Sequence, residues 1–321
     1  MPANVSDSKP VTLKDESVMP PLTSPLRDTI RRILHNRSAV IGLIMISILI
    51  LVALLADVIA THPPNQSMLD VPGEAVPGVR LPTKPPCIGL LGCPDPQHFM
   101  GLDLNGRDVF SRIVHGTRVS LLVGVSVVAF SVTVGTLIGL VAGFFGGWVD
   151  DLLMRLMDVL LAFPSLLLAI AIVTAAGPGL QNALLAIGIV SLPIYARLTR
   201  ASVLSAKEVE YVIAGRAIGA GPLRLMFLNI LPNVLTPLIV QATLGIGTAV
   251  IETAGLSFLG LGQQPPDPEW GQMLSESRAY VFTAPHMVFF PGIAITFCVL
   301  GFNLLGDGLR DALDPRLRGV T

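Results

Sequence analysis

The stretch EYVIAGRAIGAGPLRLMFLNILPN (Glu210–Asn233) decides the fold, because it interrupts two long apolar segments with a polar and structured turn. Its first half begins with an acidic residue, which suits the positive end of a helix dipole. Its second half begins at Pro222, which is favoured in a first helical turn. Gly219 and Gly221 lie between the halves and allow a sharp turn with positive φ. We therefore expect two short helices that meet at a glycine corner.

Each half of this hairpin has apolar residues at the spacing of one helix face. These residues are Val209, Val212, Ile213 and Ala217 in the first half, and Leu223, Met226, Phe227 and Ile230 in the second. The pattern predicts amphipathic helices that lie along a membrane surface. Two interpretations stay open on the residues alone, an interfacial loop and a docking element for a partner protein.

The composition around the hairpin is that of a membrane protein. Of the 321 residues, 52% are hydrophobic and 13% are charged, with a mean hydropathy of +0.70. A soluble domain has about 25% charged residues, so the composition predicts an integral membrane protein. The net charge of -1, without a basic cluster, argues against a nucleic-acid partner.

Six apolar segments predict the architecture. About 20 apolar residues cross the ~30 Å hydrocarbon core as a helix, and the backbone in lipid must satisfy its own hydrogen bonds. We therefore expect an all-α polytopic protein with six transmembrane helices. The segments are Ser38–Ala56, Val119–Trp148, Val159–Ala196 (split in two by GPGLQN at 177–182), Leu225–Ile251 and Met287–Gly306.

The basic residues predict the orientation. With the N-terminus in the cytoplasm, 15 of the 21 Lys and Arg residues fall on that side, in agreement with the positive-inside rule. Both termini and the hairpin, about 200–232, are then cytoplasmic. The expected organisation is an N-terminal segment 1–37 that is disordered to about residue 24, a first helix 38–60, an outer loop 61–117 and a core domain 118–321.

Motifs for catalysis and for energy coupling are missing from the sequence. No Gly-Lys pair exists, which excludes a P-loop, and no protease or hydrolase signature occurs. Charges inside the apolar segments, which proton- or sodium-coupled carriers need, are nearly absent. Glu252 alone lies within an apolar run, near its outer end. The chain is therefore expected to be no enzyme, and either to be passive or to take its energy from another chain.

The outer loop carries two cysteines in PPCIGLLGCPDP, Cys87 and Cys93. In an oxidising compartment we expect a disulfide between them, with two free thiols as the alternative. Their spacing is poor for zinc, and Asp103, Asn105 and Asp108 lack the ligand set of a calcium loop. We therefore expect no metal site. GLDLNGRDVF is instead expected to form a turn and a helix cap, with Arg107 and Asp108 as a pair.

The hairpin resembles the cytoplasmic loop of importer-type ABC permeases, in which E-A-A, three residues, Gly and nine residues precede I-x-L-P. Four positions match, Ala214, Gly219, Leu231 and Pro232, and three depart, Ile213, Gly215 and Asn229. Longer stretches are similar to the C-type permease of the dipeptide, oligopeptide and nickel branch. They are Arg27–Ile46, His98–Gly124, Glu252–Gly271 and Phe302–Arg316, and together they span most of the chain.

This resemblance implies a type I ABC importer permease fold in the inner membrane of a prokaryote. It implies a second homologous permease, two cytoplasmic ATP-binding subunits and an extracytoplasmic substrate-binding protein as partners. ATP and Mg would be bound by the partner subunits, with no cofactor on this chain. The hairpin would be the coupling element that drives a rigid-body switch. The residues implied in coupling are Ala214, Gly215, Arg216, Ala217, Ile218, Gly219, Ala220, Leu231 and Pro232.

Two further expectations concern the ends of the helices. Glu252, Ser257, Phe258 and Trp270 are expected to form an outer mouth or gate, with Trp270 as an interfacial anchor; alternatively, Gly and Pro simply end the fifth span. Asp150, Asp151 and Asp158 are expected to cap the third span.

The substrate stays open among dipeptides, longer peptides, glutathione-like compounds and nickel chelates. The alternative functions are a self-sufficient channel, a secondary carrier, and a membrane scaffold or sensor.

Overall fold

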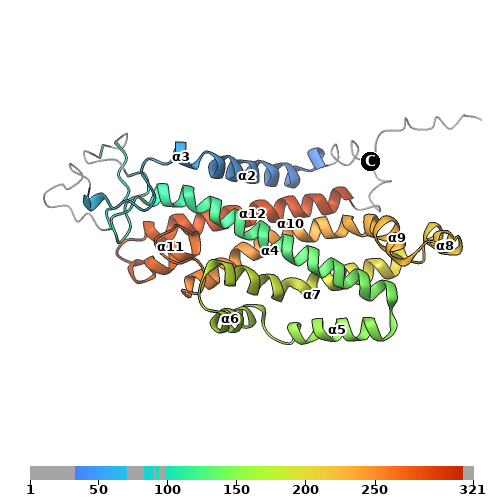
Figure 1. The fold of residues 1–321 in the computed structure, drawn as a ribbon. Coiled ribbons are helices and arrows are strands. Elements are labelled where there is room, and N and C mark those ends of the chain that lie inside the picture. Colours follow the sequence, from blue (N-terminus) through green and yellow to red (C-terminus); the bar gives the residue numbers. More distant parts are fainter. Residues whose placement is uncertain (1–32, 71–82, 90–91, 94–97, 314–321) are drawn as a thin grey trace, which may run out of the picture.

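The computed structural model describes residues 33–70, 83–89, 92–93 and 98–313 (Figure 1). Within these ranges the chain is helical, and extended pairing is limited to isolated bridges in the loops. The expected disorder of residues 1–24 and the end of the C-terminal similarity lie outside the described residues. The helical fold that the sequence predicts is confirmed.

Within the part of the chain that the structure describes, five helices are long and apolar enough to cross a membrane. They lie side by side in one elongated bundle (Figure 1). At 1.5 Å per residue even the 18 residues of the shortest approach the ~30 Å hydrocarbon core. These helices are α2 (Arg37–Leu54), α4 (Val109–Phe145), α7 (Leu180–Ala206), α10 (Leu231–Phe258) and α12 (His286–Leu313).

The third expected span is broken. Helix α5 (Gly147–Leu161) and helix α6 (Ser165–Ala176) are bent by 91° relative to each other, whereas the sequence predicts a single span from Val159. Pro164 explains the break, because proline lacks an N–H and disfavours helical backbone at the residue before it. The 12 residues of α6 reach only about 18 Å. The number of six spans therefore holds only if the bent pair counts as one.

The acidic residues of α5 do not supply its N-cap, although Asp150 lies in the first turn, where a carboxylate suits the helix dipole. The N-cap of α5 is Gly146, without a side-chain hydrogen bond. The Asp150 carboxylate instead accepts hydrogen bonds from the Arg200 guanidinium, and Asp158 pairs with Arg197. Both arginines belong to α7, so these pairs join α5 to α7 along the bundle.

Glycine positions set the closest helix contact, between α4 and α7. Gly135, Gly139 and Gly143 recur every fourth residue on α4 and face α7. A Cβ on Gly139 would lie 2.3 Å from the carbonyl oxygen of Ala196, and one on Gly135 would lie 2.8 Å from Tyr195 Cβ. Without hydrophobic attraction between helices in lipid, such close approach of backbones is what holds them together.

The short elements gather at the two ends of the bundle (Figure 1). The hairpin, with helices α8 (Glu210–Ala217) and α9 (Pro222–Arg224), lies at one end, which we call the hairpin end. The opposite end, which we call the loop end, holds the N-terminus of α4 and several short helices. These are α3 (Ala56–Ile59), η1 (Met68–Asp70), α11 (Trp270–Ser277) and η4 (Arg278–Tyr280).

Candidate functional site

The hairpin consists of α8 (Glu210–Ala217), α9 (Pro222–Arg224) and a π-helical turn, η3 (Leu225–Ile230), that leads into α10. The first half is a separate short helix, as expected. The second half is not, because Pro222–Phe258 is long and apolar enough to count as one continuous span. The hairpin is therefore a short helix attached to the end of a long one.

The corner of the hairpin is closed by backbone hydrogen bonds. The amide of Ala220 donates to the carbonyl of Gly215 (3.0 Å), and the amide of Gly219 donates to that of Arg216 (3.0 Å). This is the Schellman pattern, in which the residue after the helix adopts a left-handed conformation. Gly219 has φ +84, and glycine populates that region without steric cost. The sequence-predicted glycine corner is thus located at Gly219, whereas Gly221 has φ -67.

A polar latch holds α8 against the π-helical turn. The Tyr211 hydroxyl donates to the carbonyl of Asn229 (3.0 Å). The side-chain amide of Asn233 donates to the same carbonyl (2.9 Å) and to the Tyr211 hydroxyl. Because Asn229 and Asn233 belong to the second half, the latch fixes the angle between the two halves. The latch cannot be predicted from the sequence pattern, since its contacts depend on the register of the π-helical turn.

The apolar face predicted for the hairpin is only partly buried within the chain. Met226 and Ile230 are buried as expected, but Leu223 is 70% exposed and Phe227 is 41% exposed, and Leu225 is buried at their expense. A π-helical turn has hydrogen bonds from i to i+5, which shifts the side-chain positions relative to an α-helix. In the first half only Val212 of the predicted face is buried.

The tip of the hairpin is apolar and exposed. Ile218 is 86% exposed, and a Cβ added at Gly219 or at Gly221 would meet no atom of the chain within 4 Å. Of the residues predicted to act in coupling, Ala214, Arg216, Ala217, Ile218, Gly219 and Pro232 are exposed, and Gly215, Ala220 and Leu231 are partly buried. The hairpin thus has a base held by hydrogen bonds and an exposed apolar tip. This arrangement suits an element that packs against another protein.

The four residues predicted to form an outer mouth do not share one surface. Ser257 and Trp270 are buried, and the indole N–H of Trp270 donates to the carbonyl of Ile113 (3.2 Å). Trp270 is thus a packing residue between α11 and α4, which corrects its interpretation as an interfacial anchor. Phe258 is 38% exposed, and Glu252 is partly buried beside Ser165, its hydrogen-bond partner at the start of α6.

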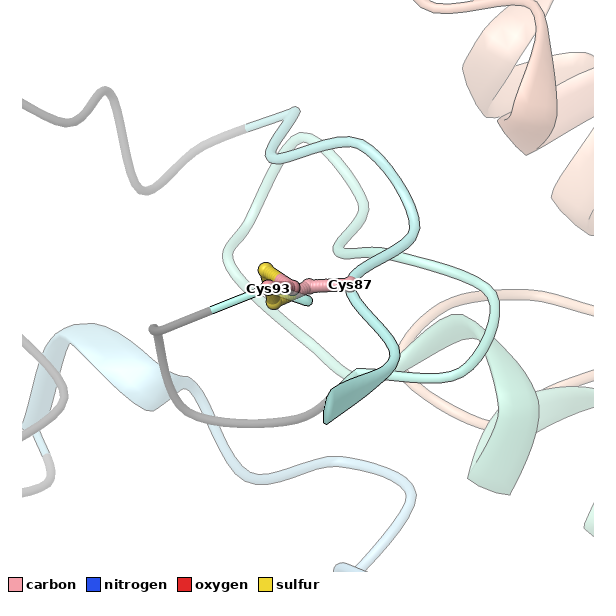
Figure 2. Close-up of a disulfide and its surroundings, with 2 residues drawn as sticks. All are labelled: Cys87 and Cys93. Carbon is pink, nitrogen blue, oxygen red and sulfur yellow. A yellow bond between two sulfur atoms is a disulfide. The ribbon is translucent and has the colours of Figure 1, made fainter. Parts of the chain in front are cut away.

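At the loop end, Cys87 and Cys93 form a disulfide, with Cα atoms 5.6 Å apart (Figure 2). Cys87 also pairs with His98 through two backbone hydrogen bonds, of 2.9 and 3.1 Å. The disulfide therefore lies next to the segment that carries His98 toward the start of α4. The structure places both cysteines in one covalent loop, as the sequence predicts.

Asp108 caps α4 with a fully buried side chain. Its Oδ2 atom accepts from the backbone N–H (2.8 Å) and the hydroxyl (2.7 Å) of Ser111, and its Oδ1 atom lies 3.0 Å from His98 Nδ1. Burial alone would raise the pKa of Asp108, but the hydrogen bonds from His98 and Ser111 outweigh it and lower the pKa. The predicted cap is thus present, although helix α4 begins at Val109, inside the expected loop 61–117.

Arg107 has other partners than the predicted Asp108. It pairs with Asp103 (2.7 Å) and with Glu276 of α11 (2.7 Å). The backbone amides of Asn105 and Arg107 also donate to Asp103, so the carboxylate closes a turn as expected. These contacts fix the loop before α4 onto α11 and give the loop end a defined shape.

Comparison with known proteins agrees with this architecture. Residues 135–319 match the family described as binding-protein-dependent transport system inner membrane component. Residues 24–77 match the N-terminal TM domain of oligopeptide transport permease C. The first match alone covers more than half of the chain.

Three relatives show how far the similarity extends. The chain is 46% identical to the dipeptide transport system permease protein DppC of Alkalihalophilus pseudofirmus, over 97% of this chain and 98% of the relative. It is 47% identical to the di/tripeptide transport system permease protein DppC of Pseudomonas aeruginosa, over 93% and 94%. It is 48% identical to the glutathione transport system permease protein GsiD of Pectobacterium atrosepticum, over 70% and 75%. The chain therefore belongs to the family of inner membrane components of binding-protein-dependent transport systems, the multi-pass permeases of ABC importers.

Proposed function

We propose that this chain is one of two permease subunits of an ATP-driven importer of peptides of the dipeptide class. The observation that carries the proposal is the full-length similarity to two permeases named for dipeptides or di- and tripeptides. The translocation pathway would be formed with a second, homologous permease. An extracytoplasmic binding protein would deliver the substrate. The loop end, with its fixed turns, is the surface suited to bind that protein.

The hairpin supplies the coupling in this proposal. It would face the cytoplasm and insert its exposed tip, around Ile218, into a cleft of an ATP-binding subunit. ATP and Mg would be bound by that subunit, and this chain would bind no cofactor. Because the latch at Tyr211 fixes the hairpin angle and η3 continues into α10, closure of the ATPase dimer would move the long helices as rigid bodies.

A second substrate class has specific support. The 48% identity to a glutathione permease favours glutathione-like compounds as the alternative cargo of the same machine. Glutathione is itself a modified tripeptide, so both cargoes carry peptide amides and charged termini. Nickel chelates remain a third possibility within the branch that the sequence resembles.

Uptake by the complete complex in proteoliposomes tests this proposal. Labelled dipeptide should accumulate only with the binding protein outside and ATP on the hairpin side. Excess unlabelled dipeptide should compete, and glutathione should compete more weakly; the reverse order would favour the glutathione alternative. Dipeptide flux through this chain alone, without ATP, would contradict the proposal and favour a channel or carrier.

A further inference from the structure

Three side chains at the loop end form a cluster that the proposed transport function does not use. Ring nitrogens of His62 and His98 and a carboxylate oxygen of Asp108 all lie within 4.8 Å of one another. They come from three separate segments: the chain after α3, the segment paired with the disulfide loop, and the cap of α4. We propose that His62, His98 and Asp108 form a zinc-binding site.

The distances suit a zinc ion. Bonds of about 2.0–2.2 Å from zinc to nitrogen or oxygen place neighbouring donor atoms about 3.3 Å apart in a tetrahedral site. His98 Nδ1 and Asp108 Oδ1 are already 3.0 Å apart. The third ligand, His62, is partly buried on a loop, and a shift of about 1.5 Å would bring its ring nitrogen to the same spacing. Zinc would replace the proton that these two groups now share.

The surroundings hold the ligands in place. The other oxygen of Asp108 is engaged by Ser111 and by Thr61 (3.3 Å), so Oδ1 is the one that faces His98. Thr61 Oγ1 also lies 3.0 Å from His62 Nδ1. Hydrogen bonds of this kind to the ligating groups fix their orientation in zinc sites. The side chains of His98 and Asp108 are both 0% exposed, which limits their motion.

The ligand types select the metal. Two imidazoles and one carboxylate are a donor set that zinc accepts, with a fourth position left for water or another ligand. Calcium and magnesium prefer sites made of oxygen atoms alone. The thiols of Cys87 and Cys93 are joined in a disulfide and take no part. A bound zinc ion would connect the chain after α3 to the start of α4 and thereby stiffen the loop end.

These ligands are not recognisable in the sequence, because metal-site patterns consist of ligands at short spacing. His62 is far from His98 in the sequence, and only the folded loops bring them together. The aspartate was correctly identified as a helix cap, and the metal site would use its second oxygen. This site is separate from the coupling role proposed for the hairpin, since its ligands follow α3 and cap α4, and both elements lie at the loop end (Figure 1).

Zinc binding by the purified complex that contains the full chain tests the inference. The complex is prepared with an affinity tag that lacks histidine, dialysed against zinc and analysed for metal. Wild type should retain one zinc ion more per chain than the His62→Ala variant, and its melting temperature should rise with zinc. His115→Ala is the matched control, because His115 pairs with Asp57 outside the cluster and its loss should leave zinc binding unchanged.

Cobalt gives a second measurement that reports direct ligation. Co²⁺ added to wild type should produce visible absorption bands of a low-coordinate site with nitrogen ligands, and His62→Ala and His62→Gln should lack them. Equal zinc content and equal spectra in wild type and the His62 variants would overturn the inference. So would a wild-type complex that retains no zinc at micromolar concentrations, in which case His98 and Asp108 are only a hydrogen-bonded cap.

Discussion

The hydroxyl of Tyr211 donates a hydrogen bond to the carbonyl of Asn229 (3.0 Å), and this contact joins the two halves of the hairpin. Tyr211 lies on α8 and Asn229 lies in the π-helical turn that leads into α10. The contact converts a surface loop into an element with a fixed angle. Stiffness of this kind is what a lever requires if it is to move α10 when its tip is pushed.

Tyr211→Phe should loosen the hairpin without unfolding the bundle. The lost hydrogen bond is worth about 1 kcal/mol, so amides of α8 should exchange hydrogen about fivefold faster. Hydrogen exchange followed by mass spectrometry measures this. Tyr280→Phe, at the opposite end, is the control and should leave α8 unchanged. Equal protection of α8 in Tyr211→Phe and in wild type would show that the latch adds no rigidity.

The two corner glycines should respond differently to alanine. Gly219→Ala forces a left-handed conformation, which costs an L-residue about 1–2 kcal/mol. Gly221 already has φ -67, which alanine adopts without strain, so Gly221→Ala should be neutral or stabilise the hairpin by up to about 1 kcal/mol. Gly219→Asn should destabilise the hairpin corner less than Gly219→Ala does, because asparagine tolerates the left-handed conformation. Hydrogen exchange of residues 210–221 distinguishes the variants, and equal effects at both positions would contradict the assignment of the corner.

Gly139→Leu should separate α4 from α7. The Cβ of the new side chain would lie 2.3 Å from the Ala196 carbonyl oxygen. Overpacking of this kind lowers the free energy of unfolding by about 1–3 kcal/mol. Gly292→Leu in α12 is the matched control, because a Cβ there meets nothing within 4 Å. Thermal unfolding in detergent should show a marked drop for the first variant alone. Similar melting temperatures of the two variants would mean that the contact of Gly139 with α7 is not tight.

Cys93→Ser should destabilise the loop end by about 2 kcal/mol. This is the loop-closure entropy that a disulfide across a sequence separation of 6 removes from the unfolded chain. The disulfide itself is checked by alkylation of the denatured chain. Without reductant only Cys298 should react, and after reduction all 3 cysteines should react. Three reactive thiols in protein purified from an oxidising compartment would show that the bond does not form.

The sequence predicted the membrane-spanning helices and the glycine corner because both follow from local patterns. Long apolar segments require helices in lipid, and Gly219 is the residue that the turn needs. The break at Pro164 was missed because the uncharged run continues across it. The burial of Leu225 was not predicted, because a π-helical turn cannot be read from a period of 3.6 residues.

Contacts between distant segments could not be predicted from the sequence. The burial of Trp270 depends on how α11 packs against α4, and the pairing of Asp150 with Arg200 depends on α5 folding back along α7. The His62, His98 and Asp108 cluster requires three loops to converge. In each case the residue was visible in the sequence, but its partner was set by tertiary structure.

Cross-linking from Ile218 tests the coupling role most directly. Ile218→Cys places a thiol on a side chain that is 86% exposed, in a chain whose other cysteines are bonded or buried. Phe282→Cys, at a residue 96% exposed at the opposite end, is the matched control. In the assembled complex, a short bifunctional reagent should join Ile218→Cys to an ATP-binding subunit and should not join Phe282→Cys to one. Absence of that product from Ile218→Cys, or an equal yield from both positions, would contradict the role of the hairpin as the contact with the ATPase.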